Sequence, residues 1–238
     1  IRKRIHDAAV KLAASVGYTS LGTIEFLLDV GKSPGEGRFA FIECTPRLQV
    51  EHTVTEEVTG VDLVQTPLQL SGGAKLSELQ LASTPPPRGF AIQARVNMET
   101  IGPDGSVRPQ SGQVQTYQPP SGPGVRVDGF GYAGYQTLTS FDSLLAKVIC
   151  HSPNDFAAAA RRSARALGEF RIQGLQTNLR LLAAILSHDD FVSGKITNRW
   201  LDERIAELSA TGEQLTNLAD TSTGGGSGFA GAQIDGTD

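Results

Sequence analysis

The fold of this chain is decided by the stretch Glu43-Cys44-Thr45-Pro46-Arg47-Leu48-Gln49-Val50-Glu51-His52. Polar and apolar residues alternate along it, starting from the apolar Ile42. Successive side chains of an extended chain point to opposite faces, so this period predicts a strand with one face on a core. The other face then carries a row of polar groups from Glu43, Thr45, Arg47, Gln49 and Glu51. Composition alone leaves a plain solvent-exposed strand as an equal alternative.

Two further strand-like segments lie just upstream, at residues 21–30 and 38–43, and the glycine- and proline-rich segment between them predicts a turn. In a hairpin symmetric about Pro34, Glu25 lies directly opposite Glu43. Two facing carboxylates repel each other, so this arrangement favours a cation between them. Mg²⁺ suits the pair because it binds one or two carboxylates and completes its shell with water and phosphate oxygens. The alternative is a register shifted by one residue, which points one Glu elsewhere.

Several motifs follow one another in a fixed order along the chain. The early ones are Glu25-Phe26, Phe41-Ile42-Glu43 and Arg47-Leu48-Gln49-Val50-Glu51-His52-Thr53-Val54-Thr55-Glu56. The later ones are Gly89-Phe90-Ala91-Ile92-Gln93-Ala94-Arg95-Val96-Asn97, Tyr132-Ala133-Gly134-Tyr135, Phe141-Asp142-Ser143-Leu144-Leu145-Ala146-Lys147 and Gly174-Leu175-Gln176-Thr177-Asn178. Together they resemble a biotin carboxylase over residues 1–205, and the Arg-x-Gln-x-Glu-His run is highly specific.

The resemblance implies an α+β fold: the C-terminal portion of an ATP-grasp fold (antiparallel sheet with helices), followed by the biotin carboxylase C-terminal α/β domain. The expected division has four parts: 1–80, the C-terminal part of the ATP-grasp domain; 81–88, a proline-rich connector; 89–207, the biotin carboxylase C-terminal domain; and 208–238, a flexible Gly/Ser-rich tail or linker. The family's N-terminal domain, its glycine-rich nucleotide lid and its phosphate-binding lysines are expected to precede Ile1.

Hydrophobic periodicity predicts helices at residues 1–16, 53–60, 61–70, 155–170, 176–187 and 196–208, and strands at 89–99, 111–118, 124–128 and 144–150. Gly17 and Gly60 are expected to end the first two helices. Pro67 is expected to interrupt the third helix, and Asn154 or Ser152 to cap the fourth.

Composition describes a soluble globular protein of one large or two small domains, with 238 residues, 39% of them hydrophobic. The net charge of −4 gives no basic footprint for nucleic acid, and no apolar run approaches the roughly 20 residues of a membrane span. The chain begins in a helical pattern rather than with a signal peptide. Cys44 and Cys150 are both expected to be buried free thiols, which indicates a cytoplasmic protein.

In the family that the chain resembles, ATP and bicarbonate form carboxyphosphate and ADP, and CO₂ released from carboxyphosphate carboxylates N1′ of biotin. The resemblance implies that Glu25 and Glu43 bind ATP through Mg²⁺ or Mn²⁺. Thr45 departs from the family, which usually has Asn as a metal ligand here. A Thr hydroxyl is a weaker ligand, so Thr45 either acts through water or leaves a weak second metal site.

The resemblance also assigns the anion and biotin sites. Arg47, Gln49 and the backbone N–H of Val50 bind bicarbonate, for which a guanidinium fork is suited. Glu51 is the general base. Arg95 binds the biotin ureido oxygen and stabilises the charge that develops there. A structural ion pair of Arg47 with Glu43 or Glu51, and a plain surface role for Arg95, are the alternatives. His52 is expected to be a packing or hydrogen-bonding residue.

The chain is thus expected to be part of an ATP-dependent ligase, inactive alone, that works with the N-terminal half of the biotin carboxylase, a biotin carboxyl carrier domain and a carboxyltransferase domain. A homo-oligomer is possible, through a surface that includes Arg126. Two other hypotheses stay open: another ATP-grasp ligase, such as a carbamoyl-phosphate or amino-acid ligase, and a degenerate non-catalytic module, which Thr45 favours. The sequence does not name the final carboxyl acceptor.

Overall fold

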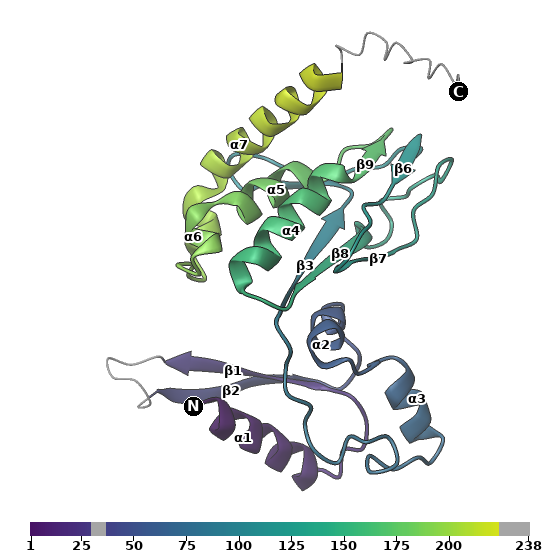
Figure 1. Cartoon of the computed structure of the whole chain (residues 1–238), viewed down its shortest axis with the longest axis vertical. Coiled ribbons are helices and arrows are strands. Elements are labelled where there is room, and N and C mark those ends of the chain that lie inside the picture. The colour runs from purple at the N-terminus through teal and green to yellow at the C-terminus, as the bar shows by residue number, and fades with distance from the viewer. Residues whose placement is uncertain (30–36, 224–238) are drawn as a thin grey trace, which may run out of the picture. The chain divides into compact units, whose positions relative to one another are not determined.

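A computed structural model of the chain describes residues 1–29 and 37–223, with side chains as far as residue 213 (Figure 1). The predicted turn at residues 31–36 and the Gly/Ser-rich segment from residue 224 lie outside the described residues. The chain divides into two compact units. The first unit is Ile1–Gln93 with His151–Ala159, and the second is Ala94–Cys150 with the chain from Ala160 onward.

The first unit contains a two-stranded antiparallel sheet and three helices. Its elements are α1 (Arg2–Ser15), β1 (Thr23–Asp29), β2 (Arg38–Thr45), α2 (His52–Thr59) and α3 (Gln65–Ser71). The predicted helix ends are confirmed, because Gly17 and Gly60 follow α1 and α2 with φ of 63° and 73°. In this left-handed region glycine carries no Cβ penalty, so it ends a helix readily.

The long predicted strand ends earlier than the alternating pattern indicates. β2 stops at Thr45, and the next residue is Pro46, which has no N–H for a strand ladder. Residues 46–51 form a bend and a turn rather than one strand face. The apolar face is also wrong at three positions, because Ile42 is 52% exposed and Cys44 and Pro46 are exposed too.

The remainder of the described chain is built on a three-stranded sheet of order β3-β8-β7, in which β7 and β8 are antiparallel, and on two small antiparallel pairs, β4 with β5 and β6 with β9. The strands are β3 (Phe90–Asn97), β4 (Glu99–Ile101), β5 (Val107–Pro109), β6 (Thr116–Gln118), β7 (Val125–Gly129), β8 (Leu144–Ser152) and β9 (Arg171–Gln173). The helices are α4 (Phe156–Glu169), α5 (Leu179–Ser187), α6 (Asp189–Val192) and α7 (Trp200–Thr223).

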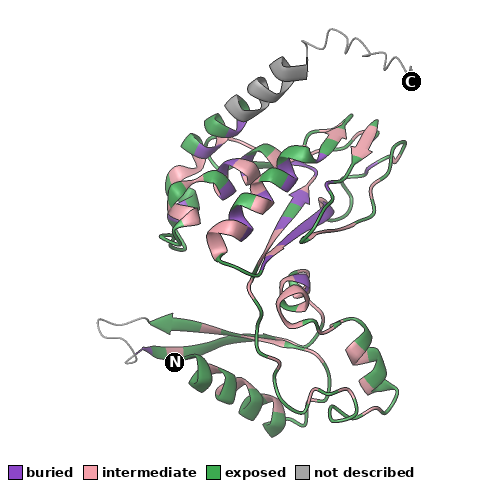
Figure 2. Cartoon of the chain, in the orientation of Figure 1, coloured by how far each residue is buried: buried purple, intermediate pink, exposed green. Residues whose placement is uncertain are grey.

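Buried residues gather in β3, β8, α4 and α5 (Figure 2). Every residue from Leu145 to Cys150 is buried, as predicted for a buried strand and for the Cys150 thiol, whose pKa is raised by burial. A second core cluster joins α5 to α7 through Leu181, Ala184, Trp200 and Leu208. No helix among the described residues is both long enough and apolar enough to span a membrane.

Several predicted boundaries in this part differ from the structure. The strand predicted at 111–118 is reduced to Thr116–Gln118, and the last helix continues past residue 208 to Thr223. The cap of α4 is neither Asn154 nor Ser152: Asp155 Oδ1 accepts a hydrogen bond from the backbone N–H of Ala158 at 2.6 Å. A carboxylate at this position also interacts favourably with the positive end of the helix dipole.

Candidate active site

The two predicted metal-binding carboxylates face each other across the β1–β2 hairpin. Glu25 pairs with Glu43 in the antiparallel register, and Thr23 pairs with Thr45 two positions further along. Both glutamates are exposed, and Thr45 is partly buried. The register prediction is confirmed at this pair, and the alternative register shifted by one residue is excluded.

A β-bulge at Ile42 produces this opposition. Glu25 pairs with Glu43, but the next residue, Phe26, pairs with Phe41, so Ile42 has no partner in the ladder. Pairs nearer the turn are therefore not symmetric about Pro34, and without the bulge Glu25 would lie opposite Ile42. Bulges commonly re-aim side chains beside functional sites. The sequence prediction missed the bulge, since no turn or glycine signal marks residue 42.

The carboxylate pair suits a hard divalent cation. Within residues 1–29 and 37–213, neither Glu25 nor Glu43 has a hydrogen bond or ion pair that neutralises its charge. The described residues contain no group of three or more His, Cys, Asp or Glu side chains placed to hold a metal. A pair of carboxylates is a ligand set that suits Mg²⁺, which keeps several waters and binds phosphate oxygens.

Arg47 lies in the bend after β2 and is exposed. Its Nη1 donates a hydrogen bond to the backbone oxygen of Leu48 at 3.0 Å. Among the residues whose side chains are described, Arg47 makes no ion pair with Glu43 or Glu51, so the structural alternative for this arginine is wrong. Its guanidinium keeps donors available for a planar anion.

His52 fixes the turn that presents Gln49, Val50 and Glu51. Its Nδ1 donates to the backbone oxygen of Gln49 at 2.8 Å, and its Nε2 lies 3.8 Å from Glu56 Oε2. A carbonyl oxygen only accepts, so this contact assigns the proton to Nδ1. In a trans peptide the carbonyl of Gln49 and the N–H of Val50 point in opposite directions. Holding the carbonyl toward α2 thus turns the Val50 N–H the other way.

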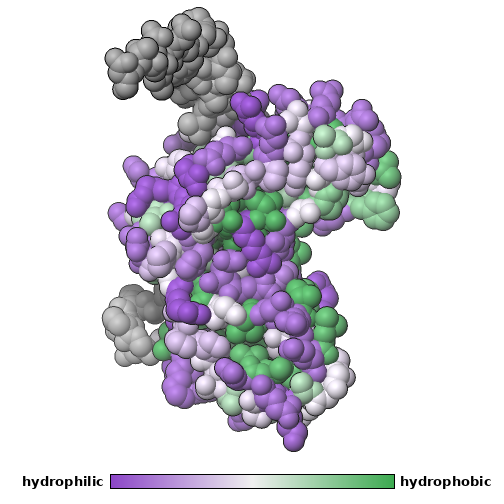
Figure 3. All heavy atoms as spheres, turned by 45° about the vertical axis from the view of Figure 1, so that its right-hand side comes forward, coloured by the Kyte–Doolittle hydropathy of each residue, from purple (hydrophilic) through white to green (hydrophobic). Residues whose placement is uncertain are grey.

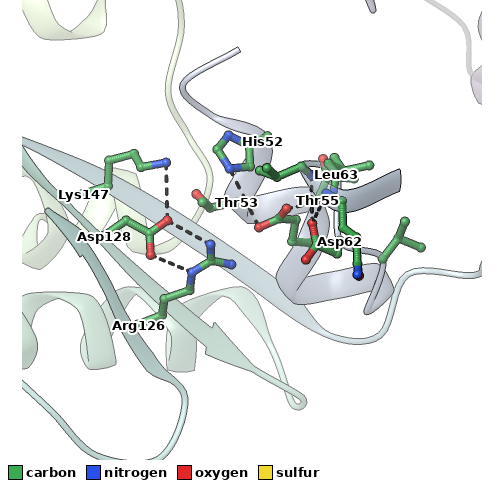
Figure 4. A network of polar contacts seen from close by, with 12 residues as sticks. His52, Thr53, Thr55, Asp62, Leu63, Arg126, Asp128 and Lys147 are labelled. Carbon is green, nitrogen blue, oxygen red and sulfur yellow. Dashed lines mark hydrogen bonds and ion pairs between the residues drawn. The ribbon is translucent and has the colours of Figure 1, made fainter. Parts of the chain in front are cut away.

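His52 therefore behaves as predicted, as a hydrogen-bonding residue at the start of a helix (Figure 4). The same helix is tied to the chain beyond it, because Glu56 Oε1 accepts a hydrogen bond from the backbone N–H of Leu63 at 2.8 Å. Glu51 is the N-cap residue of α2 and makes no side-chain cap bond. It is exposed at the helix N-terminus, where the helix dipole favours a carboxylate.

Arg95 belongs to the second unit and lies in β3. It is exposed between two buried neighbours, Ala94 (5% exposed) and Val96 (0% exposed). Its backbone oxygen accepts a hydrogen bond from Asn178 Nδ2 at 3.1 Å. Sequence reasoning placed Asn178 in a motif but gave it no role, because a contact across such a separation leaves no local signal.

A charged cluster on β7 and β8 is structural. Arg126 makes two hydrogen bonds of 2.8 Å to Asp128, and Lys147 Nζ lies 3.5 Å from the same carboxylate (Figure 4). Burial alone would raise the pKa of Asp128, but the hydrogen bonds and charge of Arg126, together with Lys147, hold this pKa below its usual range. Asp142 Oδ1 accepts a hydrogen bond from the backbone N–H of Leu144 at 2.8 Å, which fixes the chain at the start of β8.

Two family models match successive parts of the chain. Residues 1–79 match the carbamoyl-phosphate synthase L chain, ATP binding domain, and residues 93–203 match the biotin carboxylase C-terminal domain. The fold and the carboxylate pair thus define the end of an ATP-grasp domain joined to a second α/β domain, the architecture of an ATP-dependent ligase. The second of these segments is thus similar to the C-terminal domain of biotin carboxylases.

Known proteins are similar to this chain over most of its length. The chain is 40% identical over 238 residues to a pyruvate carboxylase from Aspergillus terreus, covering 95% of this chain and 19% of that protein. It is 41% identical over 202 residues to biotin carboxylase 1 from Bacillus subtilis, covering 85% of this chain and 43% of that protein. The chain therefore spans about a fifth to less than half of the length of these relatives.

A solved structure provides a further comparison. The biotin carboxylase domain of the 2-oxoglutarate carboxylase from Hydrogenobacter thermophilus, a dimer in complex with MgADP, ADP and bicarbonate, is 33% identical with a TM-score of 0.76. The match covers 87% of this chain and 44% of that one.

Proposed function

We propose that this chain supplies the metal, bicarbonate, base and biotin sites of a biotin carboxylase, which carboxylates biotin on a carrier domain with ATP and bicarbonate through carboxyphosphate. The observation that carries the proposal is the opposition of Glu25 and Glu43 across a bulged hairpin, in a chain whose residues 93–203 match a biotin carboxylase C-terminal domain.

Glu25 and Glu43 would hold Mg²⁺ (or Mn²⁺) against the phosphates of ATP. The bound ion neutralises charge on the transferring phosphoryl group. A similar protein has been solved in complex with MgADP and bicarbonate, which supports these ligands. Thr45 lies two residues beyond Glu43 on β2, and its hydroxyl completes the metal-facing group either through water or as a weak ligand.

Arg47, Gln49 and the Val50 N–H would form the bicarbonate site. Arg47 is exposed and makes no ion pair with a neighbouring glutamate, so its planar fork can meet two oxygens of a carbonate-like anion. The His52 contact to the Gln49 carbonyl supports an anion site because it orients the Val50 N–H. Glu51, next in the chain, would take the bicarbonate proton.

Arg95 would bind the ureido oxygen of biotin. As N1′ loses its proton, negative charge gathers on that oxygen, and a fixed guanidinium stabilises this charge more in the transition state than in the ground state. The exposed position of Arg95 between two buried neighbours on β3 supports this role, because the strand is anchored while the side chain stays accessible.

The hairpin of the first unit exposes large apolar side chains, which supports a partner that would cover them. On β1 and β2, Leu27 is 66% exposed, Phe41 53% and Ile42 52%, and Figure 3 shows hydrophobic side chains at the surface. Large exposed apolar areas mark interaction sites. The N-terminal half of the biotin carboxylase would cover this hairpin, and the chain would be inactive without it.

The remaining parts of the proposal rest on the relatives. A biotin carboxyl carrier domain and a carboxyltransferase domain would be the other partners, and the latter would select the acceptor. The dimeric relative supports a homo-oligomer. We retain the cytoplasm as the compartment and the limits 1–80, 81–88 and 89–207 as parts of this proposal. The expected tail 208–238 is not retained from residue 208, because α7 continues to Thr223 and Leu208 is buried against α5.

The test is substitution in the full-length protein. Arg47→Ala and Arg95→Ala should each lower biotin-dependent ATP hydrolysis at least about a hundredfold, because each removes a charge that meets a developing anion. Arg199→Ala is the matched control, since the Arg199 side chain is 78% exposed and, among the described side chains, its ion pair is with Glu203 in the first turn of α7. Full activity in either active-site variant would refute the role of that residue.

One observation favours a different outcome. Thr45 occupies a metal-ligand position of the family with a weaker ligand, as expected of a degenerate, non-catalytic module. Calorimetry of Mg-nucleotide binding to the full-length protein distinguishes an active biotin carboxylase from a degenerate module, since an absence of binding would favour the degenerate module. Another ATP-grasp ligase would keep the Glu25–Glu43 pair, but the match of residues 93–203 argues against it.

A further inference from the structure

Asn178 stands at the N-cap of α5, yet its side chain does not cap the helix. An Asn at this position usually accepts a hydrogen bond from an N–H of the first helical turn. Here the amide oxygen accepts instead from the backbone N–H of Asn97 at 2.9 Å, from a residue 81 positions away. Asn178 is only 8% exposed, so its amide is committed to the interior and to β3.

The contacts of Asn178 cover an open edge of the sheet. β3 is an edge strand, because β8 is its only neighbour in the described sheet. Along this edge Asn178 Nδ2 donates to the backbone oxygen of Arg95 at 3.1 Å, and the Asn178 backbone N–H donates to the oxygen of Asn97 at 3.1 Å. Together with the bond from the Asn97 N–H, Asn178 makes three hydrogen bonds to backbone groups of β3 with which a neighbouring strand would otherwise pair.

The end of the same strand is anchored separately. The Met98 N–H donates to the backbone oxygen of Ser143 at 2.7 Å, and Ser143 Oγ donates to Glu99 Oε2 at 2.9 Å. Asn97 Nδ2 donates to the other oxygen of the buried Glu99 at 3.0 Å. These bonds fix the strand after Asn97, and the side chain of Asn178 holds the backbone oxygen of Arg95.

We propose that Asn178 is a positioning residue for Arg95: its side-chain amide holds the Arg95 peptide so that the guanidinium meets the biotin ureido oxygen. This inference rests on the proposed function of Arg95. Arg95 is a long, flexible side chain on an edge strand, and its reach depends on where its backbone lies. A small displacement of a substrate-binding group is enough to slow a reaction strongly.

The experiment compares Asn178→Ala and Asn178→Asp with Arg95→Ala in the full-length protein. Alanine removes both side-chain bonds. Aspartate keeps an acceptor for the Asn97 N–H but loses the donor to the Arg95 oxygen. Two rates are measured for each variant: biotin-dependent ATP hydrolysis, in which the proposed role of Arg95 lies, and bicarbonate-dependent ATP cleavage without biotin, which offers no ureido oxygen to Arg95.

We expect both Asn178 variants to lower the biotin-dependent rate by about ten- to a hundredfold. The biotin-independent rate and the KM for ATP should stay unchanged. A merely structural role would lower both rates in proportion to the loss of folded protein. Asp155→Ala is the matched control, because it removes a true helix cap, that of α4, without touching β3.

Hydrogen exchange gives a readout independent of catalysis. In Asn178→Ala, peptides that contain Asn97 should exchange faster than in the parent protein, because that N–H loses its acceptor. If Arg95→Ala abolishes the biotin-dependent rate and the Asn178 variants keep it, the inference is overturned while the proposed function stands. If Arg95→Ala itself keeps that rate, the proposed role of Arg95 fails, and the inference fails with it.

Discussion

Gly174 provides the sharpest prediction about stability. Its φ is 98°, and a Cβ placed on it would lie 2.0 Å from the backbone oxygen of Gln113 and 2.9 Å from the backbone nitrogen of Gln115. Both contacts are backbone atoms beside β6, which pairs with β9 just before Gly174. Neither can move without opening that pair. Gly174→Ala should therefore be strongly destabilising.

The expected loss of unfolding free energy in Gly174→Ala has two causes. A non-glycine residue at this φ costs about 1–3 kcal/mol, and the overlap with fixed backbone adds about 1–3 kcal/mol. Gly134→Ala is the matched control, because Gly134 has nearly the same φ, 93°, and no atom lies within 4 Å of its added Cβ. Gly134→Ala should lose only the free energy that a non-glycine residue costs at this φ.

The assay is urea unfolding of residues 1–238, followed by the fluorescence of Trp200. This is the only Trp of the chain, and it is 8% exposed in the cluster that joins α5 to α7. We expect Gly174→Ala to lower the free energy of unfolding by about 1–3 kcal/mol more than Gly134→Ala. Equal losses in the two variants would refute the reasoning from steric overlap.

Three further predictions concern charge and hydrogen bonding. Glu43→Gln should stabilise the metal-free full-length protein by up to about 1 kcal/mol, because it removes repulsion from Glu25, but should abolish the rise in melting temperature that Mg-ADP gives the parent protein. His52→Phe should raise the KM for bicarbonate about tenfold without changing the KM for ATP, because the carbonyl of Gln49 then keeps only the longer bond from the backbone N–H of residue 52, at 3.3 Å. The pKa of Asp128 is lowered from its ordinary value of 3.8, so its ion pairs stabilise the fold fully above pH 3.8, and this stability is lost as pH falls through the lower folded pKa. Asp128→Asn should therefore flatten the pH dependence of the urea midpoint in that range.

Each of these predictions has a clear contrary result. If Mg-ADP raises the melting temperature of Glu43→Gln as much as that of the parent protein, Glu43 is not a metal ligand. An unchanged KM for bicarbonate in His52→Phe would show that the turn holds its shape without the imidazole. An acid transition that is the same in Asp128→Asn and the parent protein would mean that other carboxylates set the acid stability.

The sequence alone determined the features that depend on neighbouring residues. The glycines after α1 and α2 end those helices, and the apolar run of β8 forms a buried strand, because both effects act within a few residues. The family motifs also gave the fold class, which the matches over residues 1–79 and 93–203 confirm. The roles of the site residues and the domain limits stay predictions.

The tertiary structure decided which distant groups meet. The alternating pattern from Glu43 to His52 continues past Pro46, but the strand does not, because a ladder needs backbone donors and a partner strand. The bulge at Ile42, which sets Glu25 opposite Glu43, depends on how the whole hairpin pairs. Asn178 reaches β3 across 81 residues of chain, and only packing selects that contact over the local helix cap. Local propensity acts over a few residues, whereas the choice among hydrogen-bond partners is settled by the folded chain as a whole.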